Sequence, residues 1–182
     1  ASEKGIIVMS AAGNEGNGTW HYILTPADNV QVFSVGAVTS SGESSAFSSY
    51  GPNYLGAVKP DASARGSFTA MVYNNSATNG SGTSFSTPLA AGGVASLLQA
   101  LPGTLTRDAV KKLLREKASL YPDYTGQMGY GILNFGNAYA QYLAAGEVPV
   151  KNIFSVYPNP NRGQFTVEST ENTTLKVLDM NG

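Results

Sequence analysis

Residues 80–92, GSGTSFSTPLAAG, lead from a glycine-rich loop into a helix that we expect to run from Ser84 to Leu101. The helix is rich in Ala and Leu, and small residues in its middle permit close backbone packing, so we expect it to be buried. Ser84 opens the helix, and its backbone N–H is therefore one of the unsatisfied donors at the helix N-terminus. Such a donor favours negative charge beside the Ser84 hydroxyl. One residue can thus supply both a nucleophile and an anion-binding N–H.

A plain helix cap is the alternative interpretation of this stretch. Ser and Thr are favoured at helix starts, so a Gly-Thr-Ser tripeptide by itself indicates a cap as readily as a catalytic centre. Pro88 lies early in the expected helix and has no N–H to offer the Ser84 carbonyl. The residues around the helix must decide between the two interpretations.

Two apolar runs precede the helix and predict buried strands. The first covers Gly5 to Ala12, and the second covers Val32 to Val38. Neither run alternates in polarity, which is typical of parallel strands that are covered on both faces. The loop between the runs contains several polar and aromatic residues, and loops at the carboxyl ends of such strands often carry ligand sites. This loop is a candidate site.

Two further helices are predicted after the first. One begins at Thr106, which is a suitable N-cap, with Asp108 in the first turn and Leu105 placed to contact Val110. The other covers approximately 137–145 and ends before Gly146, a residue type favoured just beyond a helix. The alternation of strands and helices predicts an α/β fold.

Several ordered motifs resemble the subtilisin family. GTSFSTPLAAG is similar to its nucleophile motif, and SAAGNEG at 10–16 is similar to its oxyanion-hole motif. VFSVGAV, FSSYGP, KPDASARG and GYGILN also follow in the family's order. The resemblance covers roughly residues 1–145. It implies the C-terminal part, residues 1–146, of a three-layer peptidase domain with a mainly parallel sheet, here partial.

The resemblance also implies roles for individual residues. Ser84 would be the catalytic nucleophile, and Asn14 with the Ser84 N–H would form the oxyanion hole. Pro26 falls where the family has a cis-proline beside the substrate pocket. The implied substrate-binding residues are Ala12, Gly13, Glu15, Pro26 and Thr83. A secreted serine endopeptidase acting on proteins or peptides is the expected function.

The family's catalytic Asp and His precede its Ser, and neither is matched here. The one histidine, His21, follows the Asn14 motif, so we expect it to be an ordinary loop residue beyond hydrogen-bond reach of Ser84. We therefore expect Asp and His to lie in a missing N-terminal segment and the fragment alone to be inactive. The alternative is a non-catalytic, subtilisin-like binding domain whose remaining half has lost one of them.

After Gly146 the sequence loses its helical pattern and contains several prolines. Residues 147–155 read as a proline-containing linker, and 156–182 contain short alternating segments at 164–169 and 175–180. VYPNPNRGQFTVE followed by LKVLDMNG resembles the start of the sorting domain of type IX secretion substrates, a small β-sandwich that is truncated here. The resemblance implies a partner in the outer-membrane secretion machinery and a secreted or cell-surface protein. An adhesion protein, considered from the tail alone, leaves residues 1–145 unexplained.

Composition excludes several other classes. The formal net charge of -1 and the absence of a basic block disfavour nucleic acid as a partner. No apolar run reaches the roughly 20 residues that a membrane span needs. The chain has no cysteine, which excludes a disulfide framework and a thiolate nucleophile. We expect no metal or cofactor in the chemistry, while a structural calcium site stays open because backbone carbonyls can bind calcium without a motif.

Overall fold

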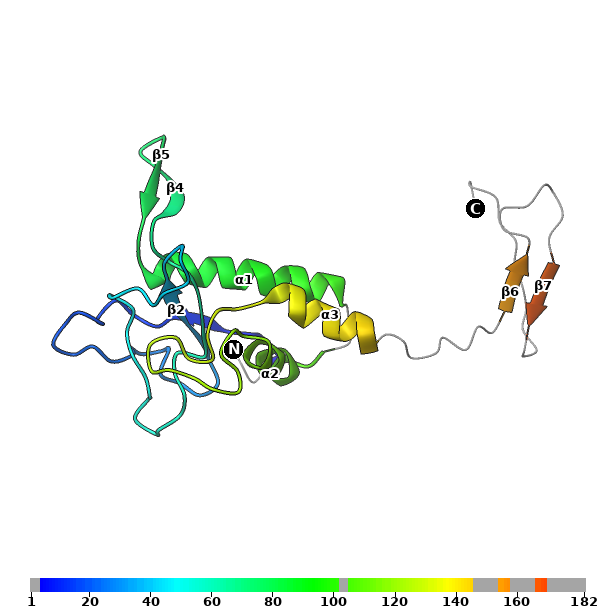
Figure 1. The fold of residues 1–182 in the computed structure, drawn as a ribbon, viewed down its shortest axis with the longest axis horizontal. Coiled ribbons are helices and arrows are strands. Elements are labelled where there is room, and N and C mark those ends of the chain that lie inside the picture. The colour runs from blue at the N-terminus through cyan, green and yellow to red at the C-terminus, as the bar shows by residue number, and fades with distance from the viewer. Residues whose placement is uncertain (1–3, 102–104, 146–153, 158–165, 170–182) are drawn as a thin grey trace. The chain divides into compact units, whose positions relative to one another are not determined.

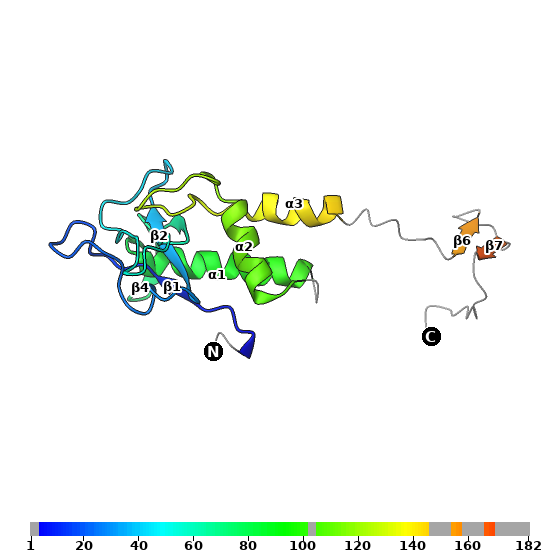
Figure 2. The same cartoon turned by 90° about the horizontal axis from the view of Figure 1, so that it is seen from below.

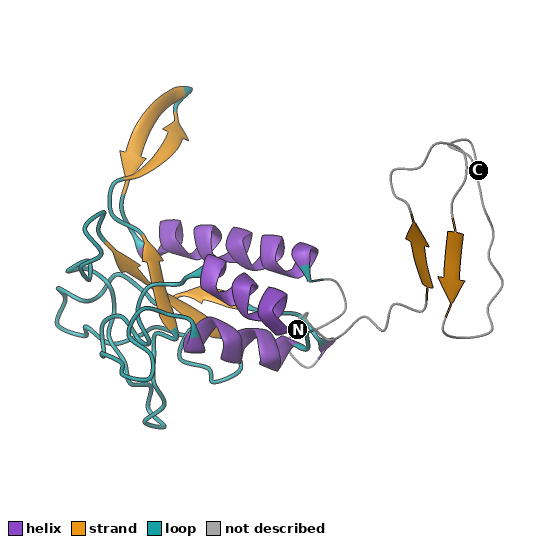
Figure 3. Ribbon diagram, turned by 45° about the vertical axis from the view of Figure 1, so that its right-hand side comes forward, coloured by secondary structure: helices purple, strands orange, loops and turns teal. Residues whose placement is uncertain are grey.

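The computed structural model describes residues 4–101, 105–145, 154–157 and 166–169. The chain divides into two units, Ala1–Gln141 and Tyr142–Gly182. Figures 1 and 3 show that the long loops of the first unit gather at the end of the sheet where its longest helix begins. That end carries the residues singled out by the sequence.

A parallel three-stranded sheet forms the centre of the first unit. Its strands are β1 (Met9–Ala11), β2 (Phe33–Val38) and β3 (Ala62–Arg65), in the order β1-β2-β3. Every residue of β2 is buried, including Ser34, which confirms the buried strand that the mainly apolar run predicted. The described sheet ends at β1, whose residues are only half-buried.

The first predicted strand is shorter and less buried than expected. We predicted a strand over Gly5 to Ala12 that is covered on both faces, but β1 comprises only Met9–Ala11. The Phe33 N–H still donates to the Val8 carbonyl at 2.9 Å, so the chain runs beside β2 before β1 begins. Within the part of the chain that the structure describes, β1 has a partner strand on one side only, and this edge position explains its partial burial.

Helix α1 (Thr83–Ala100) contacts all three strands of the sheet and begins one residue before Ser84. We predicted a buried helix, but α1 buries only one stripe of residues, because the sheet covers one side of it; the buried residues are Thr83, Ser86, Ala90, Val94 and Leu97. A β-carbon on Gly93 would lie 2.2 Å from the ring of Phe135, so no larger residue fits there without movement. Phe135 begins helix α3 (Phe135–Ala145), and this contact brings α1 and α3 together.

Helix α2 (Arg107–Glu116) begins as predicted, with the Thr106 side chain accepting a hydrogen bond from the Ala109 N–H at 3.3 Å. Asp108 in its first turn pairs with Arg107 at 2.8 Å. Hydrogen bonds from Arg107 and then Lys111 lower the pKa of Asp108 to about 2. Figure 2 shows α2 beside α1 in the view from below.

Three charged side chains connect α2 to the sheet. Asp61 is 1% exposed and its Oδ2 accepts from the Lys59 Nζ at 2.8 Å, while its Oδ1 accepts from Arg115 of α2. Lys59 also donates to the Val32 carbonyl, and the Ser34 N–H and hydroxyl donate to Asp61. Burial lowers the pKa of Lys59, although the neighbouring Asp61 carboxylate opposes that shift.

A β-hairpin that the sequence analysis did not anticipate projects beside the start of α1 (Figure 1). It consists of β4 (Thr69–Tyr73) and β5 (Ser76–Gly80), paired antiparallel. Asn74 and Asn75 form the turn with φ of 48° and 60°. Asn tolerates this left-handed conformation, which two-residue hairpin turns require. The Asn-Asn pair was the signal that could have predicted the hairpin.

The second unit contains a further hairpin, formed by β6 (Phe154–Tyr157) and β7 (Thr166–Ser169) in antiparallel pairing. β7 confirms part of the strand predicted over 164–169. β6 begins at Phe154, before the predicted domain start at 156, so the expected linker 147–155 overlaps a strand. The strand predicted over 175–180 and Gly146 lie outside the described residues.

Candidate active site

Thr83, the first residue of α1, fixes the orientation of the Asn14 side chain. The Asn14 Oδ1 accepts hydrogen bonds from the Thr83 N–H at 2.9 Å and from the Thr83 hydroxyl at 3.0 Å. The same hydroxyl accepts from the Gly13 N–H at 3.2 Å. Because Oδ1 is committed to Thr83, the amide nitrogen Nδ2 is the end of Asn14 that remains for another partner.

Gly82 lies between the two key side chains. A β-carbon placed on Gly82 would be 3.2 Å from the Ser84 Oγ and 3.3 Å from the Asn14 Nδ2. The hydroxyl and the amide therefore flank one small space, which stays open because residue 82 has no side chain. The Ser84 N–H belongs to the first turn of α1, where backbone donors have no partner within the helix. The structure thus brings Asn14 and Ser84 together.

Ser84 itself is exposed. No side chain among the described residues forms a hydrogen bond with its hydroxyl. A serine hydroxyl needs an adjacent base to become a strong nucleophile. The arrangement therefore places an exposed serine hydroxyl beside an amide and a free helix N-terminus, and no basic side chain among the described residues is hydrogen-bonded to that hydroxyl.

His21 lies in the loop after Asn14 and contacts aromatic rings. Its ring centroid is 4.4 Å from that of Tyr22 and 5.9 Å from that of Tyr50. It makes no hydrogen bond to Ser84 within the described part of the chain. The prediction that His21 does not serve as the base for Ser84 agrees with this position.

The remaining predicted substrate-binding residues lie in different environments. Ala12 is fully buried. Its N–H donates to the Val35 carbonyl and its carbonyl accepts from the Leu24 N–H, so its backbone helps to hold the chain that leads to Asn14. Thr83 is 1% exposed and positions Asn14. Pro26 is exposed and follows a cis peptide bond, as the resemblance implies.

The loop that carries Asn14 is held by Ser49, a residue that the sequence analysis did not single out. The Ser49 N–H donates to the Gly13 carbonyl at 3.0 Å, and its hydroxyl accepts from the Glu15 N–H at 3.0 Å. Gly13 has a φ of 112°, and a β-carbon there would lie 2.7 Å from the Ser49 hydroxyl. Ser49 and Gly82 were missed because their roles depend on contacts with residues distant in sequence. FSSYGP, which contains Ser49, was the available signal.

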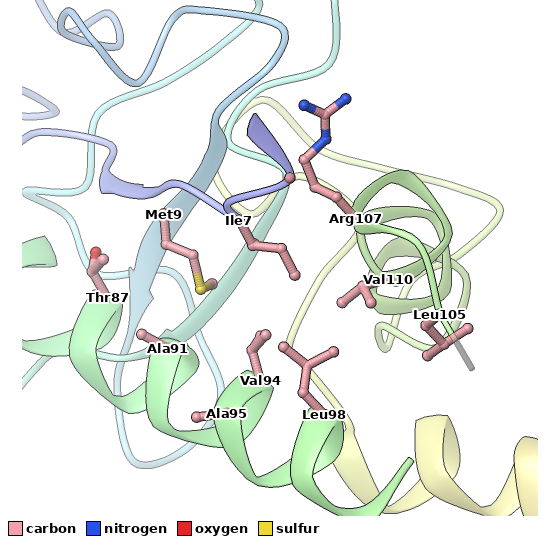
Figure 4. A pocket seen from close by; sticks show the side chains of 11 residues that line it. Ile7, Met9, Thr87, Ala91, Val94, Ala95, Leu98, Leu105, Arg107 and Val110 are labelled. Atoms are coloured by element: carbon pink, nitrogen blue, oxygen red, sulfur yellow. The ribbon is translucent and has the colours of Figure 1, made fainter. Parts of the chain in front are cut away.

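An apolar groove of about 430 Å³ lies away from these residues, between β1, α1 and α2 (Figure 4). Ile7 and Met9 face it from the β1 side, and Val94 and Leu98 face it from α1. Val110 closes the α2 side, and Arg107 lies at the top in Figure 4. The lining of the groove is mainly aliphatic, whereas the Ser84 arrangement brings together a hydroxyl and an amide.

The described residues contain no group of three or more His, Cys, Asp or Glu side chains placed to hold a metal ion. Among the same residues, no helix combines the length and the apolar character that crossing a membrane would require.

Two family models match the chain. The model described as the subtilase family matches residues 1–139, and the one described as a secretion system C-terminal sorting domain matches residues 155–182. The first match includes Asn14, Thr83 and Ser84, and the second begins within β6.

Curated relatives and solved structures agree with the first match. Subtilisin DY of Bacillus licheniformis is 34% identical over 135 residues, covering 74% of this chain and 47% of that protein. Serine protease AprX of Bacillus subtilis (strain 168) is 33% identical over 161 residues, covering 76% and 36%. The self-cleaved protease domain of PatA superposes with a TM-score of 0.63 at 27% identity, covering 78% and 52%. The chain therefore spans less than half the length of these two curated relatives.

Proposed function

Because the chain belongs to the subtilase family, we propose that it is the nucleophile-bearing part of a secreted serine endopeptidase. The main support for this proposal is that Ser84 Oγ and Asn14 Nδ2 both lie beside the small space that a side chain at position 82 would occupy. In this proposal Ser84 Oγ attacks the carbonyl carbon of a peptide bond. The carbonyl oxygen then becomes an anion and accepts hydrogen bonds from Asn14 Nδ2 and the Ser84 N–H.

The proton of Ser84 has to pass to a base and then to the leaving amine, which completes acyl transfer. A subtilase orders its triad as Asp, His and Ser, so the Asp and His of this enzyme would precede residue 1. Water then hydrolyses the acyl-enzyme by the same route. No step of this proposed mechanism requires a metal or another cofactor.

The free edge of β1 and the groove beside it support a preceding segment. Among the described strands, half-buried β1 pairs only with β2, which leaves its other edge available for a further strand. The groove of about 430 Å³ beside it is lined mainly by aliphatic side chains. A strand added at this edge would bury those side chains, which favours its association.

The sorting domain makes the protein a secreted or cell-surface one. We further propose that its partner is an outer-membrane secretion machinery and that its substrates are proteins or peptides. The secretion machinery would recognise the tail, while the peptidase unit acts after export.

Active-site labelling of the complete protein tests this proposal. A fluorophosphonate should label Ser84, as located by mass spectrometry, and the Ser84→Ala variant should neither react nor hydrolyse peptides. The 182-residue fragment should react far more slowly, because it lacks the base. If the complete protein, shown to be folded by circular dichroism, is not labelled, the alternative of a non-catalytic binding domain replaces the proposal.

A further inference from the structure

Exposed aromatic residues from two loops line a second hollow, of about 370 Å³. Trp20 and Tyr22 come from the loop after Asn14, and Tyr54 comes from the loop after β2. Their side chains are 60%, 45% and 86% exposed, whereas aromatic rings normally gain from burial. Asp28 also lines the hollow. None of these residues belongs to the Asn14, Thr83 and Ser84 arrangement.

Hydrogen bonds connect the loop after Asn14 to the loop after β2 without a ligand. The Tyr50 N–H donates to the His21 carbonyl at 2.9 Å, and the Ile23 N–H donates to the Tyr50 carbonyl at 2.7 Å. Buried Asn53 adds a third connection, because its Nδ2 donates to the Asp28 carbonyl at 2.7 Å. These bonds hold the walls in place, so a ligand need not order the loops as it binds.

The walls combine aromatic rings with one acidic residue. Trp20 and Tyr22 stand at 82° to each other with centroids 6.0 Å apart, so they form two walls that are nearly perpendicular. A cation is attracted to the faces of such rings. Asp28 contributes a carboxylate that forms no ion pair within the described ranges, and its Oδ2 accepts one hydrogen bond from Thr25 at 3.3 Å. A neutral apolar ligand would cover this carboxylate without pairing it, which costs free energy.

We propose that this hollow binds the cationic side chain of a lysine or arginine in a polypeptide. The ammonium or guanidinium group would lie against the aromatic walls and donate hydrogen bonds to the Asp28 carboxylate, and the aliphatic stem would contact Ile23. The site requires no catalysis by Ser84 and therefore stands whether or not the proposed peptidase function does.

Trp20 is the chain's one tryptophan, so its fluorescence reports on the hollow directly. The probe is a short peptide, acetyl-Gly-Lys-Gly-amide, titrated into the 182-residue chain. The matched control is the same peptide with its lysine acetylated on Nε, which has nearly the same shape but no charge. We expect a saturable change with the lysine peptide and at least about tenfold weaker binding of the acetylated peptide. Equal binding of both peptides, or no saturable change with either, would overturn the proposal.

Two variants assign the interaction to the hollow. Asp28→Asn keeps the shape and the main-chain bond to Asn53 but removes the charge, and it should weaken lysine-peptide binding by about tenfold. Tyr54→Ala removes one wall and should also weaken binding. Glu43→Gln removes an exposed carboxylate from another loop and should leave the affinity unchanged. Circular dichroism establishes that each variant is folded, and the indole proton signal of Trp20 provides a second readout. Unchanged binding by folded Asp28→Asn would contradict the assignment.

Discussion

At the scale of the single residue, Asn14 and Thr83 together place one amide nitrogen beside Gly82 and Ser84. Asn14 offers its amide nitrogen to the space above Gly82, and Thr83 determines which end of the amide points there. The amide is nearly symmetric in shape, so an unrestrained side chain could present its oxygen instead. Oxygen would repel a developing oxyanion, which makes the orientation as important as the residue type.

We expect Asn14→Ala in the complete protein to lower kcat by about 10² to 10³ with little change in KM. The reason is that its hydrogen bond strengthens as the oxyanion forms, and the magnitude is the one known for the equivalent donor in subtilisin. Steady-state peptide hydrolysis measures both constants. Unchanged kcat in a folded variant would remove Asn14 from the mechanism.

Thr83→Val tests the orienting hydroxyl. The change removes one of the two hydrogen bonds to Asn14 Oδ1 while the Thr83 N–H keeps the other, so we expect about a tenfold fall in kcat. Thr83→Ser retains a hydroxyl and should keep most of the activity. A purely structural role for Thr83 would lower stability in both variants without this difference in kcat at equal folded fraction.

At the scale of elements, α2 is attached to the sheet through charge as well as apolar packing. Asp61 follows β2 in the chain, lies at the entrance to β3, and receives bonds from Lys59, Ser34 and Arg115. The Arg115 guanidinium also lies 5.9 Å from the centroid of the Phe33 ring in β2. Such a buried cluster stabilises only as a complete set, because removing one partner leaves the others charged and unpaired.

Asp61→Ala should therefore lower the free energy of unfolding by about 3–5 kcal/mol. Asp108→Ala is the matched control, since this carboxylate also pairs with Arg and Lys but is 66% exposed. Exposed pairs contribute far less, because water screens both charges. Urea unfolding followed by circular dichroism compares the two, and equal losses would contradict the importance of burial.

The lowered pKa of Lys59 predicts that the free energy of unfolding depends on pH. Its pKa in the folded chain is lowered from 10.5, chiefly by burial, so the unfolded chain binds more protons between the lowered value and 10.5. Stability attributable to Lys59 must then rise with pH across this window. The difference in unfolding free energy between the wild type and Lys59→Met isolates the contribution. We expect that difference to shift in favour of the wild type as pH increases, and a shift in the opposite direction would refute the lowered pKa.

At the scale of the whole molecule, the chain combines a subtilase-family unit with a secretion system sorting domain. The two matches occupy separate ranges, 1–139 and 155–182, so the signal can be removed without cutting the matched peptidase range. The described sheet also has an open edge at β1. Activity and export should therefore depend on different parts of the protein.

Deleting residues from 150 onward in the complete protein should retain it inside the cell envelope while its peptidase activity persists. Fractionation with an antibody locates the protein, and peptide hydrolysis by each fraction measures its activity. A control that removes the same number of residues from an unrelated exported protein excludes a general defect. Normal secretion of the deletion variant would contradict the sorting role.

The local pattern of the sequence determined much of what positions the site. The glycine-rich loop and Ser84 predicted where a helix begins, because helix starts depend on neighbours in the chain, whereas the predicted burial holds for one stripe of α1 only. Thr106 predicted the start of α2 for the same reason. The buried β2 strand was equally clear from its mainly apolar run.

Only the tertiary structure decided how these parts combine. Thr83 and Asn14 are 69 positions apart, so no local pattern could indicate that one orients the other. Thr83 was predicted to bind substrate; the structure adds that it is 1% exposed and hydrogen-bonded to Asn14. The short, half-buried β1 likewise depended on which strands pair beside it, and the aromatic hollow depended on two loops meeting. Hydrogen-bond direction and burial arise from segments distant in sequence, and packing brings those segments together.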